Sequence, residues 1–172
     1  SFAYGRGMAA HEAASRAQAG DVVLACDPDV LMVGAKGALG LCVSQGEMAK
    51  ALASGTWMGR ALRPVRISFV GEMASDVDVR DVGRMLISRL AGRVTADRVL
   101  VFRGGDFSLE ERMVLCGMMQ KLGARSALFQ AFAGAGECEI ALAEVRPSLL
   151  LPDGRVTEAC PSVSVQAVFV GG

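Results

Sequence analysis

Hydrophobic side chains recur along this chain with two periods, one typical of amphipathic helices and the other typical of strands. Val79, Val82 and Leu86 are three and four residues apart, so they share one face of a helix. An unbroken apolar run such as 99–102 is typical of a strand that is buried on both faces. The pattern predicts helices over 9–19, 45–53, 78–92 and 108–123, a turn-rich passage at 34–40, and strands over 21–26, 65–70, 99–102, 126–129, 139–143 and 163–170.

The repeated strand-helix-strand order predicts an α/β fold with three layers, α/β/α, and a mostly parallel sheet. Helix ends carry their own signals, because Ser108 and Glu111 have the spacing of a capping box and Gly92 follows the last apolar turn of its helix. We expect one unit over 1–172, either undivided or as two small lobes. A proline- and glycine-containing stretch with a turn at 152–154 predicts a mobile or linker segment over 146–161.

The composition predicts a globular protein, because 52% of the 172 residues are hydrophobic and 21% are charged. Lysine plus arginine and aspartate plus glutamate both number 18, so no basic excess favours nucleic acid as a partner. No apolar run approaches the roughly 20 residues that cross a bilayer, and the first residues lack the order of a secretory signal. We expect a cytoplasmic protein that binds neither nucleic acid nor a membrane.

Metal-binding side chains are sparse in this sequence. Five cysteines are scattered without a C-x-x-C pair, and His11 is the single histidine. A zinc site or a Cys-His catalytic pair therefore has few groups to draw on. Cys26, Cys116 and Cys138 stand among apolar neighbours and are expected to be small core side chains. No metal ligand is predicted in this chain.

Three segments resemble one known family in their order and spacing. Residues 27–37 read D-P-D-V-L-M-V-G-A-K-G, which is similar to D-S-H-T-x-T-x-G-A-x-G. Residues 46–57 read G-E-M-A-K-A-L-A-S-G-T-W, similar to S-T-D-M-A-x-x-L-A-T-G-x-T-W, and 108–124 read S-L-E-E-R-M-V-L-C-G-M-M-Q-K-L-G-A, similar to S-M-E-E-R-M-T-L-C-N-M-x-x-E-x-G-A. These patterns belong to the large subunits of aconitase and isopropylmalate dehydratase, so the resemblance implies an aconitase-like fold.

The resemblance implies a hydro-lyase framework in which a hydroxy di- or tricarboxylate binds at an iron–sulfur cluster. Residues 165–172 resemble the strand V-D-Q-V-F-I-G-S, which in the family leads to the first cysteine ligand in G-S-C-T-N, and a later C-x-x-C supplies the other two. We therefore expect no cofactor in this chain alone, and an iron–sulfur cluster only if a partner chain supplies its ligands. The family's motif histidine is Asp29 here, and its Asn and Glu are Gly117 and Lys121.

These replacements favour a non-catalytic protein of this family that binds, regulates or assembles. Two alternatives stay open, a subunit of a split hydro-lyase completed by a partner chain and a cofactor-free enzyme acting on a related acid. If the chain is active, the resemblance implies dehydratase or isomerase chemistry. The high aliphatic content and nine methionines favour an apolar interface, so the expected partner is a second copy or a complementary dehydratase subunit.

The candidate catalytic groups are Asp27, Asp29 and Lys121. The two carboxylates follow a predicted strand, where α/β proteins place their ligands, and carboxylates can act as acid and base. The simpler interpretation is that Asp27 caps a turn and Asp29 is solvated. Relative to the family pattern, Asp29 gains negative charge and Lys121 gains positive charge, which predicts a salt bridge between them.

A small carboxylic acid is the expected ligand, and five residues are candidates for binding it. Gly34, Lys36 and Gly37 belong to a glycine-rich loop whose amides and ammonium group can face an anion. The loop lacks the Walker and dinucleotide patterns, so tight packing is the alternative role of its glycines. Arg112 and Arg125 flank one predicted helix and can bind a carboxylate by paired hydrogen bonds, although ordinary surface charge explains them as well.

Overall fold

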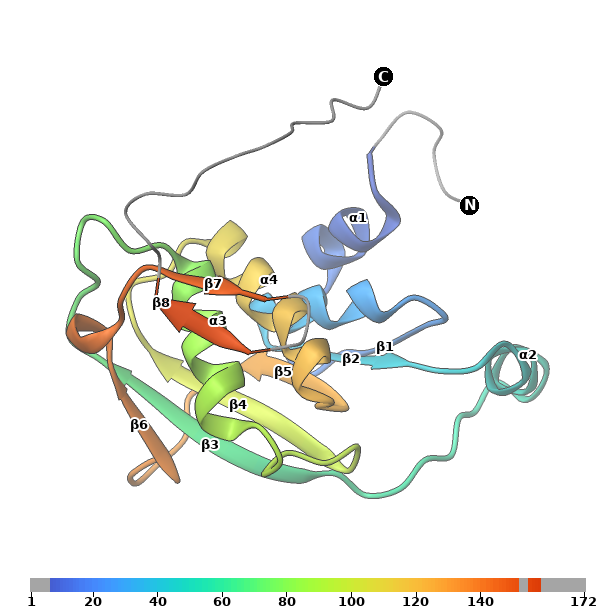
Figure 1. The fold of residues 1–172 in the computed structure, drawn as a ribbon. Coiled ribbons are helices and arrows are strands. Elements are labelled where there is room, and N and C mark those ends of the chain that lie inside the picture. Colours follow the sequence, from blue (N-terminus) through green and yellow to red (C-terminus); the bar gives the residue numbers. More distant parts are fainter. Residues whose placement is uncertain (1–6, 152–154, 159–172) are drawn as a thin grey trace.

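The structure follows the predicted alternation of helices and strands. The computed structural model describes residues 7–151 and 155–158 (Figure 1). Its α-helices are α1 (Ala9–Arg16), α2 (Gln45–Ser54), α3 (Val79–Leu90) and α4 (Leu109–Met118), and its 3-10 helices are η1 (Pro28–Lys36), η2 (Met119–Leu122) and η3 (Leu142–Glu144). Its strands are β1 (Val22–Ala25), β2 (Leu39–Cys42), β3 (Arg63–Val70), β4 (Arg98–Gly104), β5 (Ser126–Phe129), β6 (Cys138–Ala141), β7 (Ser148–Leu150) and β8 (Val156–Glu158).

A four-stranded parallel sheet with the order β5-β4-β3-β6 forms the centre of the fold. The chain runs β3, α3, β4, α4, β5, so one helix joins β3 to β4, another joins β4 to β5, and each returns the chain to the same end of the sheet. β1 and β2 form a separate parallel pair, and β7 and β8 form an antiparallel pair. The predicted three-layer α/β class with a mostly parallel sheet is confirmed.

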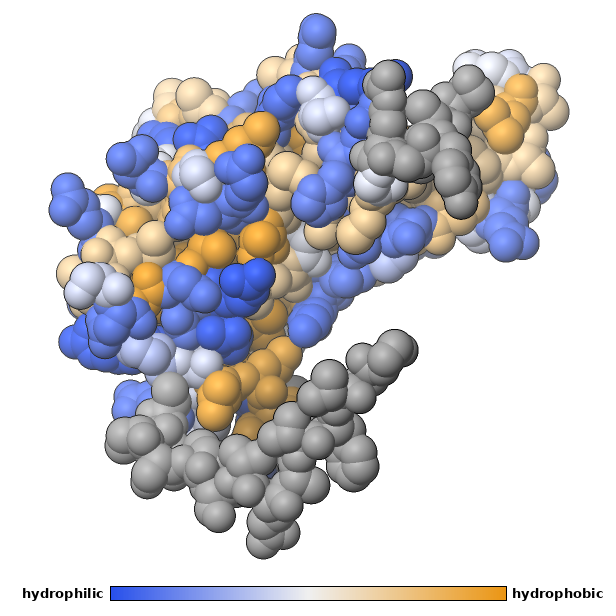
Figure 2. All heavy atoms as spheres, turned by 90° about the horizontal axis from the view of Figure 1, so that it is seen from above, coloured by the Kyte–Doolittle hydropathy of each residue, from blue (hydrophilic) through white to orange (hydrophobic). Residues whose placement is uncertain are grey.

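α3 and α4 cover one face of this sheet, and η1 lies beside α4 with α1 outside it (Figure 1). On the other face, Val99, Val101 and Leu128 pack with Leu39, Leu62 and Phe132. Seen from above, polar side chains cover most of the outer surface and an apolar strip crosses its middle (Figure 2). α2 stands apart from these layers, and none of its residues is buried.

No helix in the described ranges is long and apolar enough to cross a bilayer.

Four phenylalanines form the centre of the core between the sheet and its helices. The ring centroids of Phe69 and Phe102 are 5.6 Å apart, and those of Phe102 and Phe129 are 5.2 Å apart. Phe107 stands edge-on to Phe69 at 5.2 Å. Because Phe107 lies just before α4, while the other three lie near the carboxyl ends of their strands, the cluster fixes the start of α4 at that end of the sheet.

The local sequence around α3 sets both ends of this helix. The Asp78 carboxylate accepts hydrogen bonds from the backbone N–H groups of Arg80 at 2.7 Å and Asp81 at 3.2 Å, which closes the first turn. The helix ends at Leu90, and Gly92 follows with a φ of 73°, a left-handed value that glycine adopts without strain. Both predicted boundaries are confirmed.

The predicted helix over 108–123 begins at its capping box, but its last turn is a 3-10 helix. The Ser108 hydroxyl accepts the N–H of Glu111 at 3.2 Å, and the Glu111 carboxylate accepts the N–H of Ser108 at 2.7 Å. After Met118 the chain tightens into η2 and leaves it at Gly123, whose φ is 81°. The predicted end at Gly123 is confirmed, whereas the type of the last turn is 3-10 rather than α.

The passage at 34–40 and the first helix differ from prediction. The passage holds the end of η1 and the start of β2, and β2 pairs in parallel with β1. Glycines interrupt its apolar run, so periodicity alone did not reveal a strand there. α1 ends at Arg16, earlier than the predicted end at Ala19. The predicted strand over 163–170 lies outside the described residues.

Part of the predicted linker over 146–161 is paired structure, because β7 and β8 form an antiparallel pair within it. The N–H and hydroxyl of Ser148 donate to one carboxylate oxygen of Asp81 at 2.7 Å and 3.1 Å, and Nη2 of Arg84 donates to the same oxygen at 2.7 Å. This buried carboxylate anchors β7 to α3, which corrects the linker prediction for both strands. The predicted turn at 152–154 lies outside the described residues.

Asp81→Ala is expected to lower the free energy of unfolding by about 2–4 kcal/mol, because buried donors lose their acceptor. Burial opposes the ionisation of Asp81, but hydrogen bonds from Arg84, Asp78 and Ser148 outweigh it and hold the pKa of Asp81 below the ordinary value of 3.8. The stabilisation is therefore complete above that pH and is lost as the pH falls through the folded-state pKa. Urea unfolding at about pH 7 and about pH 3 measures it. An equal loss in Asp76→Ala, at an exposed aspartate, would contradict the role.

Candidate functional site

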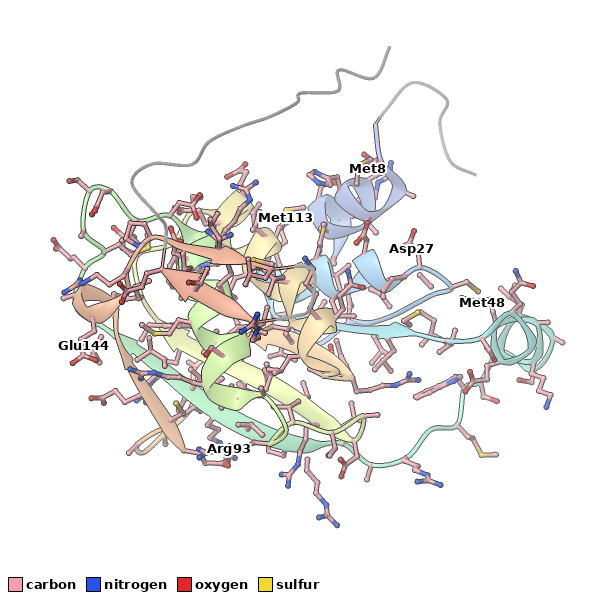
Figure 3. The ribbon with its side chains drawn as sticks, in the orientation of Figure 1. Met8, Asp27, Met48, Arg93, Met113 and Glu144 are labelled. Carbon is pink, nitrogen blue, oxygen red and sulfur yellow. The ribbon has the colours of Figure 1, made fainter. Side chains whose placement is uncertain are left out.

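The segment over 27–37 folds into the turn after β1 and the helix η1. Asp27 is the N-cap of η1, because its Oδ1 accepts the backbone N–H of Asp29 at 2.8 Å while Pro28 takes the first helical position. Asp27 is exposed and points outward from this turn (Figure 3). The simpler interpretation of Asp27, as a capping group, is confirmed.

Asp29 and Lys121 do not form the predicted salt bridge. No ion pair joins them in the part of the chain that the structure describes. Asp29 is half-buried in the first turn of η1, whereas Lys121 is exposed in the last turn of η2. The opposite charge changes therefore occur on two separate 3-10 helices, and no contact between side chains assembles Asp27, Asp29 and Lys121 into one acid-base site.

Gly34 and Gly37 allow η1 to pack tightly and to end sharply. A Cβ atom on Gly34 would lie 1.8 Å from the carbonyl oxygen of Ala127 in β5, so only glycine permits this approach. Gly37 ends η1 with a φ of 82°, and its N–H donates to the Gly34 carbonyl at 3.0 Å. Because the Gly37 amide is used inside the turn, the geometry favours the packing role of both glycines over anion binding.

Lys36 and Arg112 line the same cavity, of about 730 Å³, between the end of α1, η1 and the start of α4. Lys36 Nζ donates one hydrogen bond to the Ser15 carbonyl at 2.6 Å, which leaves two of its three donors. Arg112 Nε donates to the Phe107 carbonyl at 3.1 Å, and its guanidinium carbon lies 5.0 Å from the ring centre of Phe129. No described carboxylate lines this cavity, so neither cation is neutralised there.

Arg125 lines a different cavity, of about 800 Å³, together with Trp57, Arg60 and Arg63. The prediction that Arg112 and Arg125 bind one carboxylate as a pair is therefore wrong. β5 separates them, because Arg125 directly precedes its first residue and Arg112 lies over the ring of its last residue. The sequence analysis missed Arg60 and Arg63, although their three-residue spacing after the only tryptophan was a signal.

The thiols of the described residues do not converge on one point. Cys26 is exposed, which corrects its predicted core position, Cys42 and Cys138 are half-buried, and Cys116 is buried. Burial raises the pKa of the Cys116 thiol, so it stays protonated and unreactive. An iron–sulfur cluster needs several thiolates together. No three histidine, cysteine or carboxylate side chains in the described ranges are grouped to hold a metal, so this part of the chain does not fit a cluster.

These features define an α/β protein with a parallel sheet and a basic cavity beside a glycine-containing 3-10 helix. The chain belongs to the aconitase family, because the family model of aconitase (aconitate hydratase) matches residues 9–133. The matched range runs from α1 through β5 and includes both Lys36 and Arg112. The predicted family is therefore confirmed.

Relatives of this chain include two dehydratase subunits from Salmonella. The 3-isopropylmalate dehydratase large subunits 2 of Salmonella choleraesuis (strain SC-B67) and Salmonella typhimurium (strain LT2) are each 32% identical over 112 residues, covering 63% of this chain and 24% of the relative. The 3-isopropylmalate dehydratase large subunit 1 of Mannheimia succiniciproducens is 28% identical over 111 residues, covering 63% and 23%. The alignments thus span about a quarter of the length of these relatives.

Gly34→Ala is expected to lower the free energy of unfolding by about 1–3 kcal/mol or more, because a methyl group cannot fit beside the carbonyl of Ala127. Gly46→Ala is the matched control. Gly46 lies in α2 with no neighbouring atom within 4 Å of an added Cβ, so this exchange is expected to be neutral or stabilising by up to about 1 kcal/mol. Equal unfolding midpoints in urea for the two variants would rule out the close packing of η1 on β5.

Proposed function

We propose that this chain is a non-catalytic member of the aconitase family that binds a small carboxylic acid between η1 and α4. The observation that carries the proposal is the pair of cations, Lys36 and Arg112, on one cavity that no described carboxylate lines. An ammonium that keeps two donors and a guanidinium suit the two ends of a dicarboxylate. The volume of about 730 Å³ lies within the usual range of small-molecule sites.

The absence of catalysis is inferred from the residues that replace the family's motif. Asp29 occupies the position of the motif histidine, so the segment carries a second carboxylate besides Asp27. This added negative charge repels an anionic ligand. Asp27 is engaged as a cap, and Lys121 makes no ion pair with Asp29 among the described residues. These contacts give no support to a cofactor-free enzyme built on the three groups. An iron–sulfur cluster belongs to this proposal only with ligands from another chain.

A subunit of a split hydro-lyase is the second candidate. The relatives are named large subunits, so a complementary dehydratase subunit is the expected partner. Leu52 on α2 and Met58 after it are 78% and 93% exposed, which favours contact with a second copy or with such a subunit.

Co-purification with a complementary subunit should then give the absorbance of an iron–sulfur cluster. A colourless complex that is inert towards citrate and isopropylmalate would exclude this candidate. A cytoplasmic location stays a prediction.

Lys36→Gln and Arg112→Gln are each expected to weaken citrate binding roughly tenfold or more, because each removes a charged donor. A bound ligand stabilises the folded state, so the melting temperature of the wild type should rise with citrate concentration, and the rise should shrink in both variants. Lys50→Gln removes an exposed lysine on α2 and should keep the full rise. The same rise in all of these proteins would contradict the site.

A further inference from the structure

The second cavity, of about 800 Å³, opens at the amino ends of the sheet strands, away from the Lys36 and Arg112 site. Arg63 begins β3, Asp97 directly precedes β4, and Arg125 directly precedes β5. Trp57, Arg60 and Leu62 come from the segment between α2 and β3 and complete its wall. Three arginines and an indole therefore surround one hollow.

The two carboxylates of this cavity are already engaged. Asp97 accepts a hydrogen bond from the Thr95 hydroxyl, which is the main cause of its lowered pKa, and it lies 3.9 Å from Nε of Arg63. Glu47 accepts the N–H and the hydroxyl of Ser44, each at 2.8 Å, and the backbone hydrogen bond is the main cause of its lowered pKa. Neither carboxylate makes a hydrogen bond or close ion pair with Arg125 in the described structure.

The guanidinium groups of Arg60 and Arg125 make no hydrogen bond or ion pair within 4 Å in the described ranges, although the charge of Arg125 contributes to the lowered pKa of Glu47 in the same cavity. Arg125 is half-buried, whereas Arg60 is exposed at the rim. Guanidinium groups bind phosphate and carboxylate oxygens in a planar, paired geometry. The cavity thus keeps two donors of this kind available for an anion.

A separate observation places missing acceptors at the same edge of the sheet. Among the described residues, the buried side-chain polar atoms without a hydrogen-bond partner are Nε1 of Trp57, Nε of Arg98 and Oγ of Ser126. Arg98 and Ser126 begin β4 and β5, and Trp57 lies in the segment before β3. Native proteins leave few buried donors unsatisfied, and of these three residues only Trp57 lines this cavity, so its indole N–H is the donor that a bound group there would satisfy.

We propose that this cavity binds a small organic anion that combines a phosphate or carboxylate with a flat apolar part. The anionic group pairs with Arg60 and Arg125, and the flat part lies against Trp57 and Leu62. An aromatic wall beside arginines suits such a ligand, because the indole offers an apolar face and the guanidinium groups fix the orientation. The site is independent of the citrate site, with which it shares no lining residue.

Trp57 is the only tryptophan of the chain, so its fluorescence reports directly on this cavity. Phenyl phosphate is expected to change the emission saturably, with half-saturation below about 1 mM. Inorganic phosphate and phenol each carry one half of the proposed chemistry, and each is expected to need roughly tenfold more, or to give no change. This contrast separates recognition of both parts from a general effect of anions.

Arg125→Gln and Arg60→Gln are each expected to raise the half-saturation concentration of phenyl phosphate roughly tenfold or more. Arg89→Gln, at a surface arginine of α3 paired with Glu144, is the matched control and should leave it unchanged. Circular dichroism confirms that each variant is folded, and two separate arginine variants keep the test valid if one fails to fold.

Two results would overturn the proposal. One is the absence of a saturable change with phenyl phosphate up to about 10 mM. The other is an unchanged half-saturation concentration in folded Arg125→Gln and Arg60→Gln. Lys36→Gln is titrated in parallel and is expected to behave as wild type, so failure of this site is distinguished from failure of the citrate site.

Discussion

The close approach of η1 to β5 is the contact on which the rest of the structure depends. A hydrogen atom is the only side chain that fits at Gly34, because any larger group would overlap the Ala127 carbonyl. This contact lays η1 along the edge of the sheet and beside α4, where it places Lys36 opposite Arg112. Phe129 ends the same strand and packs against both Phe102 and Phe107. One strand therefore joins the aromatic core to the basic cavity.

Capping explains why a chain with balanced charge has cavities with unpaired cations. Lysine plus arginine and aspartate plus glutamate each number 18, but many carboxylates are bonded to backbone N–H groups at helix starts. Asp27, Glu47, Asp78 and Glu111 all serve in this way. Such carboxylates satisfy donors that a helix leaves free, although Asp78 also pairs with Arg80 at 3.6 Å. Lys36 and Arg112 line a cavity near one end of β5, and Arg60 and Arg125 line a cavity near the other, where we propose that anions bind.

The family relationship and the residues of the motif segment point to different conclusions about chemistry. In the motif segment, Asp27 caps the turn and Gly34 packs tightly against β5. The position of the motif histidine carries Asp29, and the basic group that faces a cavity is Lys36, at a variable position of the motif. A fold can keep its backbone contacts while its reactive side chains change, because packing and catalysis place demands on different atoms. Binding without turnover is the function that we propose for this combination.

The sequence by itself determined the elements whose signals are local. The capping box at Ser108, the stops at Gly92 and Gly123 and the apolar run of β4 predicted helices and strands, and the order of these elements predicted the α/β class. Tertiary structure decided where distant segments meet. The sequence did not reveal β2, because the glycines near it are required by backbone contacts with other segments, such as that of Gly34 with Ala127 in β5. It did not reveal β7, because this strand is held by hydrogen bonds to Asp81, which is remote in the sequence. Only the fold shows that Arg112 and Arg125 line different cavities, because their spacing in the sequence does not reveal that β5 lies between them. Local patterns record the conformation of neighbouring residues, whereas a site depends on contacts between segments that are remote in sequence.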